Sequence, residues 1–155
     1  MTLKRVVVVM LCFVFACEFA WAGLGSDKAM YVGGTASIKE NTEGKATAKD
    51  EKNFVFEYSG NKLVIPYDQI DSLEYGQKAG RRIGVAIMVS PLALFSKKRR
   101  HFLTLGYKDD KDKQQAAVFE LGKDVIRTML ATLEARTGRK IEYQDDEARK
   151  SGRGN

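Results

Sequence analysis

The chain has 155 residues, of which 30% are charged and 44% hydrophobic, proportions close to those of globular proteins. This composition excludes a wholly disordered chain and a protein that crosses a membrane many times, and the length predicts a single domain. The formal net charge is +6, from 26 Lys and Arg against 20 Asp and Glu. The excess of positive charge lies mainly in one segment near the middle of the chain.

The N-terminus has the order of elements found in a secretory signal peptide. Lys4 and Arg5 precede an apolar run over residues 6–17, and Ala20-Trp21-Ala22 places small residues at alternate positions. We therefore expect residues 1–22 to be removed and the protein to be exported, to the periplasm or out of the cell. A retained signal anchor is the alternative, although the apolar run is shorter than the roughly 20 residues that span a bilayer.

Both cysteines, Cys12 and Cys17, lie within this predicted signal. The processed chain would then contain no thiol, which excludes a disulfide, a thiolate nucleophile and a Cys-ligated metal. Packing must therefore supply the stability of the exported domain.

Residues 23–30 are expected to form a short lead-in, with strands following from residue 31. Short apolar stretches, several of them alternating with polar residues at a period of two, predict strands at residues 31–38, 53–58, 62–67 and 70–75. Ser59-Gly60-Asn61 predicts a tight hairpin turn between the second and third of these. Pro66 has no N–H to donate, so it must lie at a sheet edge or at the end of its strand.

The second half of the chain predicts another hairpin and then a helix. Strands are expected at residues 102–107 and 115–121, joined by the polar turn 108–113. The next segment changes to helical spacing, and its apolar residues fall on one side: Val125, Ile126, Met129, Leu130 and Leu133. Asp124 can cap this helix and Gly138 can end it. A short strand is expected at residues 141–143, and residues 144–155, which include no large apolar residue, are expected to be a disordered tail.

Six or seven short strands followed by one C-terminal helix resemble the pleckstrin-homology-like (PH-like) superfamily, especially its small bacterial and GRAM-like branches. The stretch LVIPYDQIDSLE at residues 63–74 is similar to a strand of that family with the phrase I-P-Y-x-x-I-x-S-[VL]. The phrases LEYGQ and SKKRRHF, at residues 73–77 and 96–102, resemble a group of exported bacterial proteins. The resemblance implies a mainly β domain at residues 31–143, a partly open barrel of six or seven antiparallel strands plugged by the helix. It also implies membrane or protein binding rather than catalysis.

The segment at residues 81–100 combines six basic residues with an uncharged apolar run at residues 83–95, and it contains no acidic residue. Thirteen residues in a helix reach about 20 Å, too little to cross a bilayer, but two arms folded at Ser90-Pro91 could place an apolar tip in one leaflet. Basic residues beside the tip would then lie near anionic headgroups. This membrane-contact hypothesis names Arg81, Arg82, Ile87, Met88, Leu92, Leu94, Phe95, Lys97, Lys98, Arg99 and Arg100.

The alternative is that residues 83–95 pack in the core or against a partner, with the basic residues forming a solvated strand edge. Export leaves little access to nucleic acid, so residues 97–100 do not predict a nucleic-acid site despite their charge. The expected partner is an anionic membrane surface or an unknown periplasmic protein. The pattern leaves the oligomeric state open.

The remaining polar residues predict no catalytic, metal or cofactor site. His101 is the only histidine, and the basic run beside it predicts an imidazole of low basicity, packed or solvated at a strand end. Asp109, Asp110 and Asp112 lack the glycine and terminal glutamate of a calcium loop and are expected to form a turn. The sequence therefore predicts an exported, non-enzymatic PH-like module at a membrane surface. A soluble periplasmic protein-interaction module is the alternative.

Overall fold

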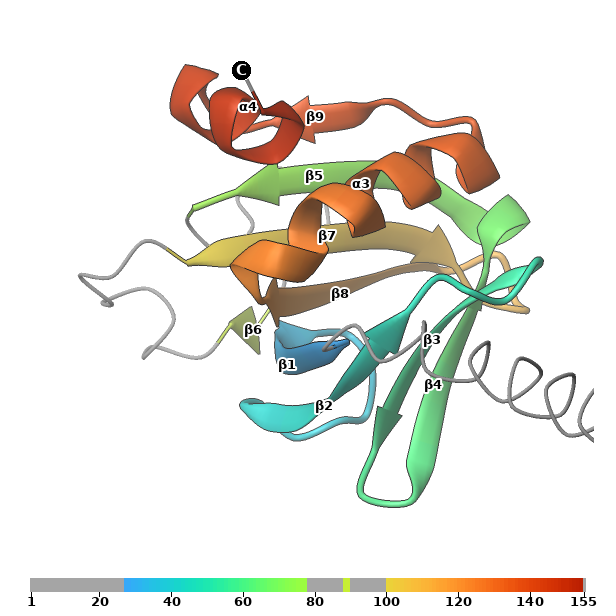
Figure 1. The fold of residues 1–155 in the computed structure, drawn as a ribbon. Coiled ribbons are helices and arrows are strands. Elements are labelled where there is room, and N and C mark those ends of the chain that lie inside the picture. Colours follow the sequence, from blue (N-terminus) through green and yellow to red (C-terminus); the bar gives the residue numbers. More distant parts are fainter. Residues whose placement is uncertain (1–26, 78–87, 90–99, 155) are drawn as a thin grey trace, which may run out of the picture.

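The structure, a computed structural model, describes residues 27–77, 88–89 and 100–154 (Figure 1). The predicted signal at residues 1–22 and most of the segment at residues 81–100 therefore lie outside the described residues. Within these residues nine strands form one sheet, and two α-helices follow the last long strand. This arrangement confirms a mainly β fold with a helix after the strands.

The strands, in chain order, are β1 (Lys28–Gly34), β2 (Thr42–Thr47), β3 (Asn53–Tyr58), β4 (Asn61–Pro66), β5 (Ile70–Gly76), β6 (Met88–Val89), β7 (His101–Lys108), β8 (Gln114–Leu121) and β9 (Ile141–Tyr143). A 3-10 turn, η2 (Tyr67–Gln69), precedes β5. The helices are α3 (Lys123–Thr137) and α4 (Asp146–Arg153).

The strand order is β4-β3-β2-β1-β8-β7-β5-β9, and β6 pairs with β1 beside this path. All described pairs are antiparallel except β5 with β9. Figure 1 shows the β3–β4 hairpin running steeply across the direction of β7 and β8, with α3 drawn in front of β5 and β7. The sheet thus curves around one core, and the apolar side of α3 packs against that core.

The β3–β4 hairpin confirms the prediction made from its alternating residues. Ser59 and Gly60 form the turn with φ values of 44° and 79°, and Tyr58 is paired with Asn61. Pro66 pairs with Asn53 at the last position of β4, which is both a strand end and a sheet edge. Its missing N–H therefore costs no ladder bond.

The first strands differ from the prediction. β1 begins at Lys28, so the lead-in expected at residues 23–30 is wrong from that residue onward. β2 was not predicted, because only Ala46 in the segment TEGKAT is apolar. Small residues are needed there: a Cβ on Gly44 would lie 2.8 Å from the ring of Phe56 and would collide with the carbonyl oxygen of Glu57. The apolar pattern does not predict β2, because this strand carries small residues that leave room for neighbouring side chains and few apolar side chains of its own.

Aromatic side chains from several strands meet in the core. The ring of Phe119 on β8 lies 5.8 Å from that of Tyr31, 5.3 Å from Phe54 and 5.0 Å from Phe56, measured between centroids. From α3, the core receives Ile126, Met129, Leu130 and Leu133, all buried, with Val125 partly buried against it. The predicted one-sided helix is therefore confirmed.

The ends of α3 agree only in part with the prediction. Gly138 takes the left-handed conformation expected of a helix C-terminus, with φ of 67°. The N-cap, however, is Gly122 rather than Asp124, which lies in the first turn. There its carboxylate still faces the positive end of the helix dipole.

The C-terminal region is ordered, so the disordered tail predicted for residues 144–155 is wrong for residues 144–154. β9 forms as expected, and α4 follows it, capped by the Asp145 side chain, which accepts a hydrogen bond of 2.7 Å from the Ala148 backbone N–H. Ala148 and Gly152 are the buried residues of this helix. The segment was misread because its packing face is made of small residues, which leave no apolar pattern in the sequence.

Candidate functional site

Most residues of the membrane-contact hypothesis lie outside the described residues. These are Arg81, Arg82, Ile87, Leu92, Leu94, Phe95, Lys97, Lys98 and Arg99, and their predicted role stays a prediction. Two members of the set can be placed: Met88 lies in β6, and Arg100 directly precedes β7.

β6 joins the middle of the apolar run to the sheet. Val89 pairs with Gly33 and Met88 with Gly34, just beyond Tyr31, where the pairing of β1 with β2 ends. At the same place β1 requires a glycine, because Gly34 has φ of 147° and a Cβ there would collide with the carbonyl oxygen of Ala116. β6 thus continues the sheet where β2 leaves it.

Arg100 has an acidic partner. Its guanidinium donates a 2.8 Å hydrogen bond to the Glu120 carboxylate on β8, and the two side chains are 30% and 23% exposed. Glu120 is paired with Phe102, so Arg100 and Glu120 lie diagonally across the start of the β7–β8 pair, where their opposite charges stabilise the pairing modestly. Arg100 therefore helps to hold the start of β7.

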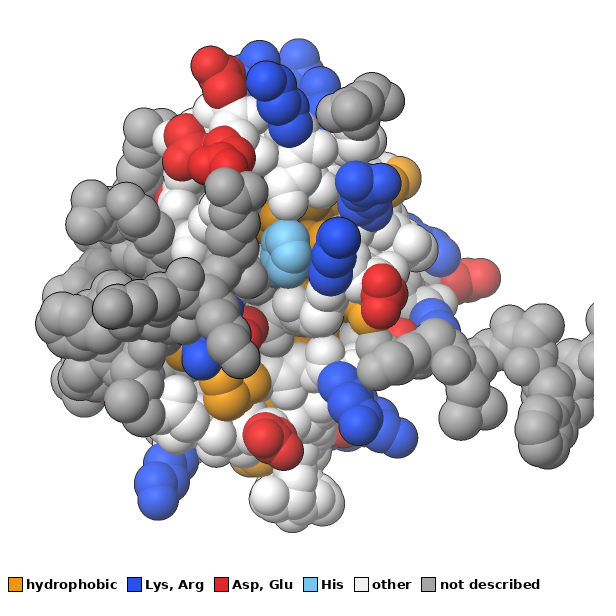
Figure 2. All heavy atoms as spheres, turned by 60° about the vertical axis from the view of Figure 1, so that its left-hand side comes forward, with side chains coloured by type: hydrophobic (Ala, Val, Ile, Leu, Met, Phe, Trp, Pro, Cys, Tyr) orange, Lys and Arg blue, Asp and Glu red, His pale blue; other side chains and the backbone are white. Residues whose placement is uncertain are grey.

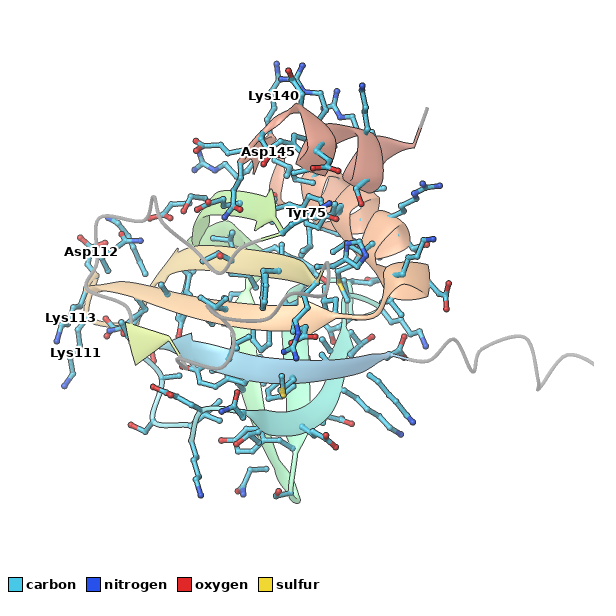
Figure 3. All side chains as sticks on the ribbon, turned by 90° about the vertical axis from the view of Figure 1, so that its left-hand side faces the viewer. Tyr75, Lys111, Asp112, Lys113, Lys140 and Asp145 are labelled. Atoms are coloured by element: carbon cyan, nitrogen blue, oxygen red, sulfur yellow. The ribbon has the colours of Figure 1, made fainter. Side chains whose placement is uncertain are left out.

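His101, Tyr75 and Ser151 form the polar cluster that most resembles a functional site. The Tyr75 hydroxyl lies 2.6 Å from His101 Nδ1 and donates a 3.2 Å hydrogen bond to Ser151 Oγ. The Tyr75 and His101 rings are stacked, with an interplanar angle of 8°. The cluster ties β5 and β7 to α4, and Figure 3 shows Tyr75 close to the helices, far from the labelled turn residues Lys111 and Lys113.

The electrostatics of this cluster favour neutral groups. Burial raises the pKa of Tyr75, whereas the bond to Ser151 opposes that rise. Burial, followed by the nearby Lys123 ammonium, lowers the pKa of His101, and Glu120 acts in the opposite direction. Figure 2 shows the histidine side chain reaching the surface beside Lys and Arg side chains. The imidazole is therefore neutral at pH 7.

The cluster does not have the geometry of a Ser-His-Asp site. Tyr75 stands between the imidazole and the Ser151 hydroxyl, so His101 is not placed to take a proton from that serine. Within the described ranges, no hydrogen bond joins His101 to a carboxylate. The arrangement holds elements together, in agreement with the expected packed histidine at a strand end.

We predict that the stability of the domain depends on pH through His101. Because folding lowers the pKa of this imidazole, the unfolded chain binds the proton more readily, so stability is complete above about pH 6.5 and falls as the pH drops below it. Urea unfolding followed by circular dichroism at pH 7, 6 and 5 measures the slope, and His101→Gln should flatten it. Lys123→Gln should flatten it in part, and an equal slope in the parent and His101→Gln would contradict the prediction.

Glu74 was not predicted as a site residue. It lies in β5, and only 3% of it is exposed. Its Oε1 accepts a 2.9 Å hydrogen bond from Gln144 Nε2, while Oε2 is buried and has no hydrogen-bond partner. A lone buried carboxylate oxygen is costly, so Glu74 is a group that requires a donor or cation. The only sign of this group in the sequence is that an acidic residue lies within the predicted strand at residues 70–75.

The acidic turn at residues 108–113 is a structural feature, as predicted. The Asp109 carboxylate accepts hydrogen bonds of 2.9 Å from the backbone N–H groups of Lys111 and Lys113. These bonds, chiefly the one from Lys113, lower the pKa of Asp109. Within residues 27–77 and 100–154, no group of three or more His, Cys, Asp or Glu side chains is placed to hold a metal ion.

The described residues include no helix long and apolar enough to cross a membrane. The chain matches no protein-family model and no curated protein. The function must therefore be argued from the geometry of the molecule.

Proposed function

We propose that the protein is an exported, non-enzymatic module with a PH-like fold that acts by binding a protein partner. Without the two-residue β6 and the three-residue β9, seven antiparallel strands remain, and α3 follows them. The apolar face of α3 packs into the core cluster formed by these strands. This order and this packing support a PH-like barrel plugged by its helix.

The pairing of β6 with β1 is the observation on which the choice of partner depends. A loop that inserts into a leaflet needs a free apolar tip. The middle of the run at residues 83–95 instead has backbone partners in Gly33 and Gly34. This supports the soluble interaction module over the membrane-contact hypothesis.

The described polar groups also favour binding over catalysis. His101 and Ser151 both contact the hydroxyl of Tyr75, and Asp109 holds a turn through backbone bonds. These groups make hydrogen bonds that hold the fold together. None of these bonds activates a nucleophile or a general base for a substrate.

Co-sedimentation with vesicles tests the choice between a protein and a membrane. We expect the protein to stay in the supernatant with both anionic and zwitterionic vesicles, at low and at high salt. The membrane-contact hypothesis requires salt-sensitive binding to the anionic vesicles, lost when Arg81, Arg82 and residues 97–99 are replaced by glutamine. Such binding would overturn the proposal.

Crosslinking in intact producing cells tests the positive claim. We expect a discrete adduct with one protein that persists after the membranes are removed. An equally stable adduct formed by a sample unfolded before crosslinking would show that the contact is not specific. No adduct in intact cells would also count against a protein partner.

A further inference from the structure

The strand β4 lies at one edge of the sheet. It is the first strand in the sheet order, and β3 is its only partner among the described strands. Figure 1 shows the β3–β4 hairpin extending below the other strands. An open strand edge offers backbone N–H and C=O groups to another extended chain. The register of the hairpin determines which of these groups are open.

The β3–β4 register fixes the direction of each backbone group. The two-residue turn places Tyr58 opposite Asn61, and residues that flank such a turn form a hydrogen-bonded pair. Hydrogen-bonded and non-bonded pairs alternate along an antiparallel ladder. The backbone groups of Leu63 therefore face β3, whereas those of Lys62 and Val64 face the open edge. Within the described part of the chain, neither Lys62 nor Val64 makes a backbone hydrogen bond outside this ladder.

Lys62 and Pro66 limit the open edge to a short span. Pro66 faces the same way as Val64 but has no N–H to donate, and Lys62 places a charge near the turn. Both residue types are common at edges where a protein prevents open-ended growth of its sheet. Lys62 and Val64 are left as complete pairing positions. This span suits a short extended segment rather than a long strand.

The exposed face beside Lys62 carries alternating charge. Lys45 on β2, Glu57 on β3 and Lys62 on β4 lie side by side across the sheet, and all three are exposed. No ion pair within the described residues includes Lys62. Because opposite charges on neighbouring strands stabilise their pairing, the next position in this row favours an acidic residue.

The neighbouring row of side chains is mainly apolar. Thr47, Val55 and Val64 lie side by side on the same face, and Val64 at the outer end is 40% exposed. A strand added to the edge would cover the Val64 side chain. A β-branched or other apolar residue is therefore favoured opposite Val64, two positions from the acidic residue.

A second copy of β4 does not meet these requirements. The strand contains no acidic residue, so the pairing of two β4 edges would leave Lys62 without a counter-charge. The favoured occupant is a different chain, which supplies a carboxylate at the position that faces Lys62.

We infer that the open edge of β4 binds an extended segment of the protein partner, antiparallel to β4, with an apolar residue opposite Val64 and an acidic residue opposite Lys62. Antiparallel pairing lets each open position exchange both of its backbone hydrogen bonds with the residue directly opposite. The inference rests on the proposed function, in which the protein binds a protein partner. It adds the surface and the chemistry of the bound segment.

Hydrogen exchange of the free full-length chain tests whether the edge is open. We expect the amides of Lys62 and Val64 to exchange about 100-fold or more faster than those of Leu63 and Ile65, which face β3. Equal protection of the four amides would show that the edge is already paired and would overturn the inference.

A synthetic peptide tests the pairing itself. The probe is acetyl-STTVLETS-amide, in which the valine faces Val64 when the glutamate faces Lys62 in an antiparallel pair. With about 1 mM peptide we expect exchange of the Lys62 and Val64 amides to slow about tenfold, which corresponds to a Kd of about 0.1 mM. No slowing at these two amides would overturn the inference.

N-methylated peptides distinguish backbone pairing from a general apolar contact. The N–H groups of the peptide valine and glutamate would point toward β4, while that of the leucine between them would point away. N-methylation of the valine should weaken binding about tenfold, and N-methylation of the leucine should change it by less than about twofold. Equal losses from the two modifications would overturn the inference.

An exchange of charges tests the acidic position. Lys62→Glu should weaken binding of the peptide about tenfold, and a peptide with lysine in place of its glutamate should bind this variant about as well as the original pair. Lys45→Glu, two strands away from the added segment, is the matched control and should have little effect. Failure of the lysine peptide to restore binding would overturn the acidic requirement and the inference with it.

Crosslinking and vesicle binding separate this inference from the proposed function. If no peptide protects the edge while the parent chain still forms its protein adduct in cells, the partner binds at another surface and only the inference is wrong. If the peptide pairs as expected while the chain binds anionic vesicles in a salt-sensitive manner, the inference stands and the proposed function is contradicted.

Discussion

Replacing Phe119 with alanine is expected to reduce the free energy of unfolding by about 3–5 kcal/mol. The side chain is fully buried, and its ring meets those of Tyr31, Phe54 and Phe56 at centroid distances between 5.0 and 5.8 Å. Truncation removes the apolar area, leaves a cavity and breaks three aromatic contacts. Because a domain of this size is stable by only about 5–15 kcal/mol, the variant should be close to unfolding at 25 °C.

Urea unfolding followed by circular dichroism measures this change, and Val64→Ala is the matched control. Val64 is also a strand residue, but it is 40% exposed at the free edge strand β4, so its truncation should change stability by less than about 0.5 kcal/mol. Equal unfolding midpoints for the two variants would contradict a core centred on Phe119.

Replacing Gly152 with leucine is expected to displace α4 and to destabilise the domain by roughly 1–3 kcal/mol. A Cβ at this position would lie 2.8 Å from the Tyr143 ring and 3.1 Å from both Leu130 and Tyr75. These neighbours are packed side chains, so they cannot make room for a leucine. Displacement of α4 would also separate Ser151 from the Tyr75 hydroxyl.

Limited trypsin digestion and urea unfolding together test the position of α4. Gly152→Leu should expose Arg149, Lys150 and Arg153 to cleavage, whereas Arg149→Leu, which adds the same side chain on the exposed face of the helix, should leave stability unchanged. A disordered tail would make the two substitutions equivalent. Equivalence would therefore remove α4 from the fold.

The pairing of β6 with β1 bears on the proposed function. Arg100, already bonded to Glu120, is one case in which a residue of the basic segment supports the sheet. A surface for the partner should then be sought among exposed elements, such as the free edge of β4.

The sequence by itself determined the elements whose apolar residues repeat. The β3–β4 hairpin and the helix α3 could be predicted because each buries large side chains on one face, at a period of two or near 3.6. The β7–β8 hairpin is buried on both faces, and it could be predicted from two apolar stretches on either side of the polar turn at residues 108–113. The turn at Ser59 and Gly60 and the C-terminus of α3 at Gly138 followed from backbone conformations that few residues adopt. These are local properties, so they are visible in a short window of sequence.

Only the tertiary structure decided β2, β6, α4 and the cluster of Tyr75, His101 and Ser151. β2 and α4 pack through small residues such as Gly44 and Gly152, whose role is to let a distant aromatic ring approach. β6 has meaning only through its pairing with β1, which lies more than fifty residues earlier. Hydrogen bonds to Tyr75 come from residues 26 and 76 positions away in the chain. Such contacts cannot be read from a short stretch of sequence, because a small or polar residue adds nothing to the apolar periodicity that predicts a strand or a helix.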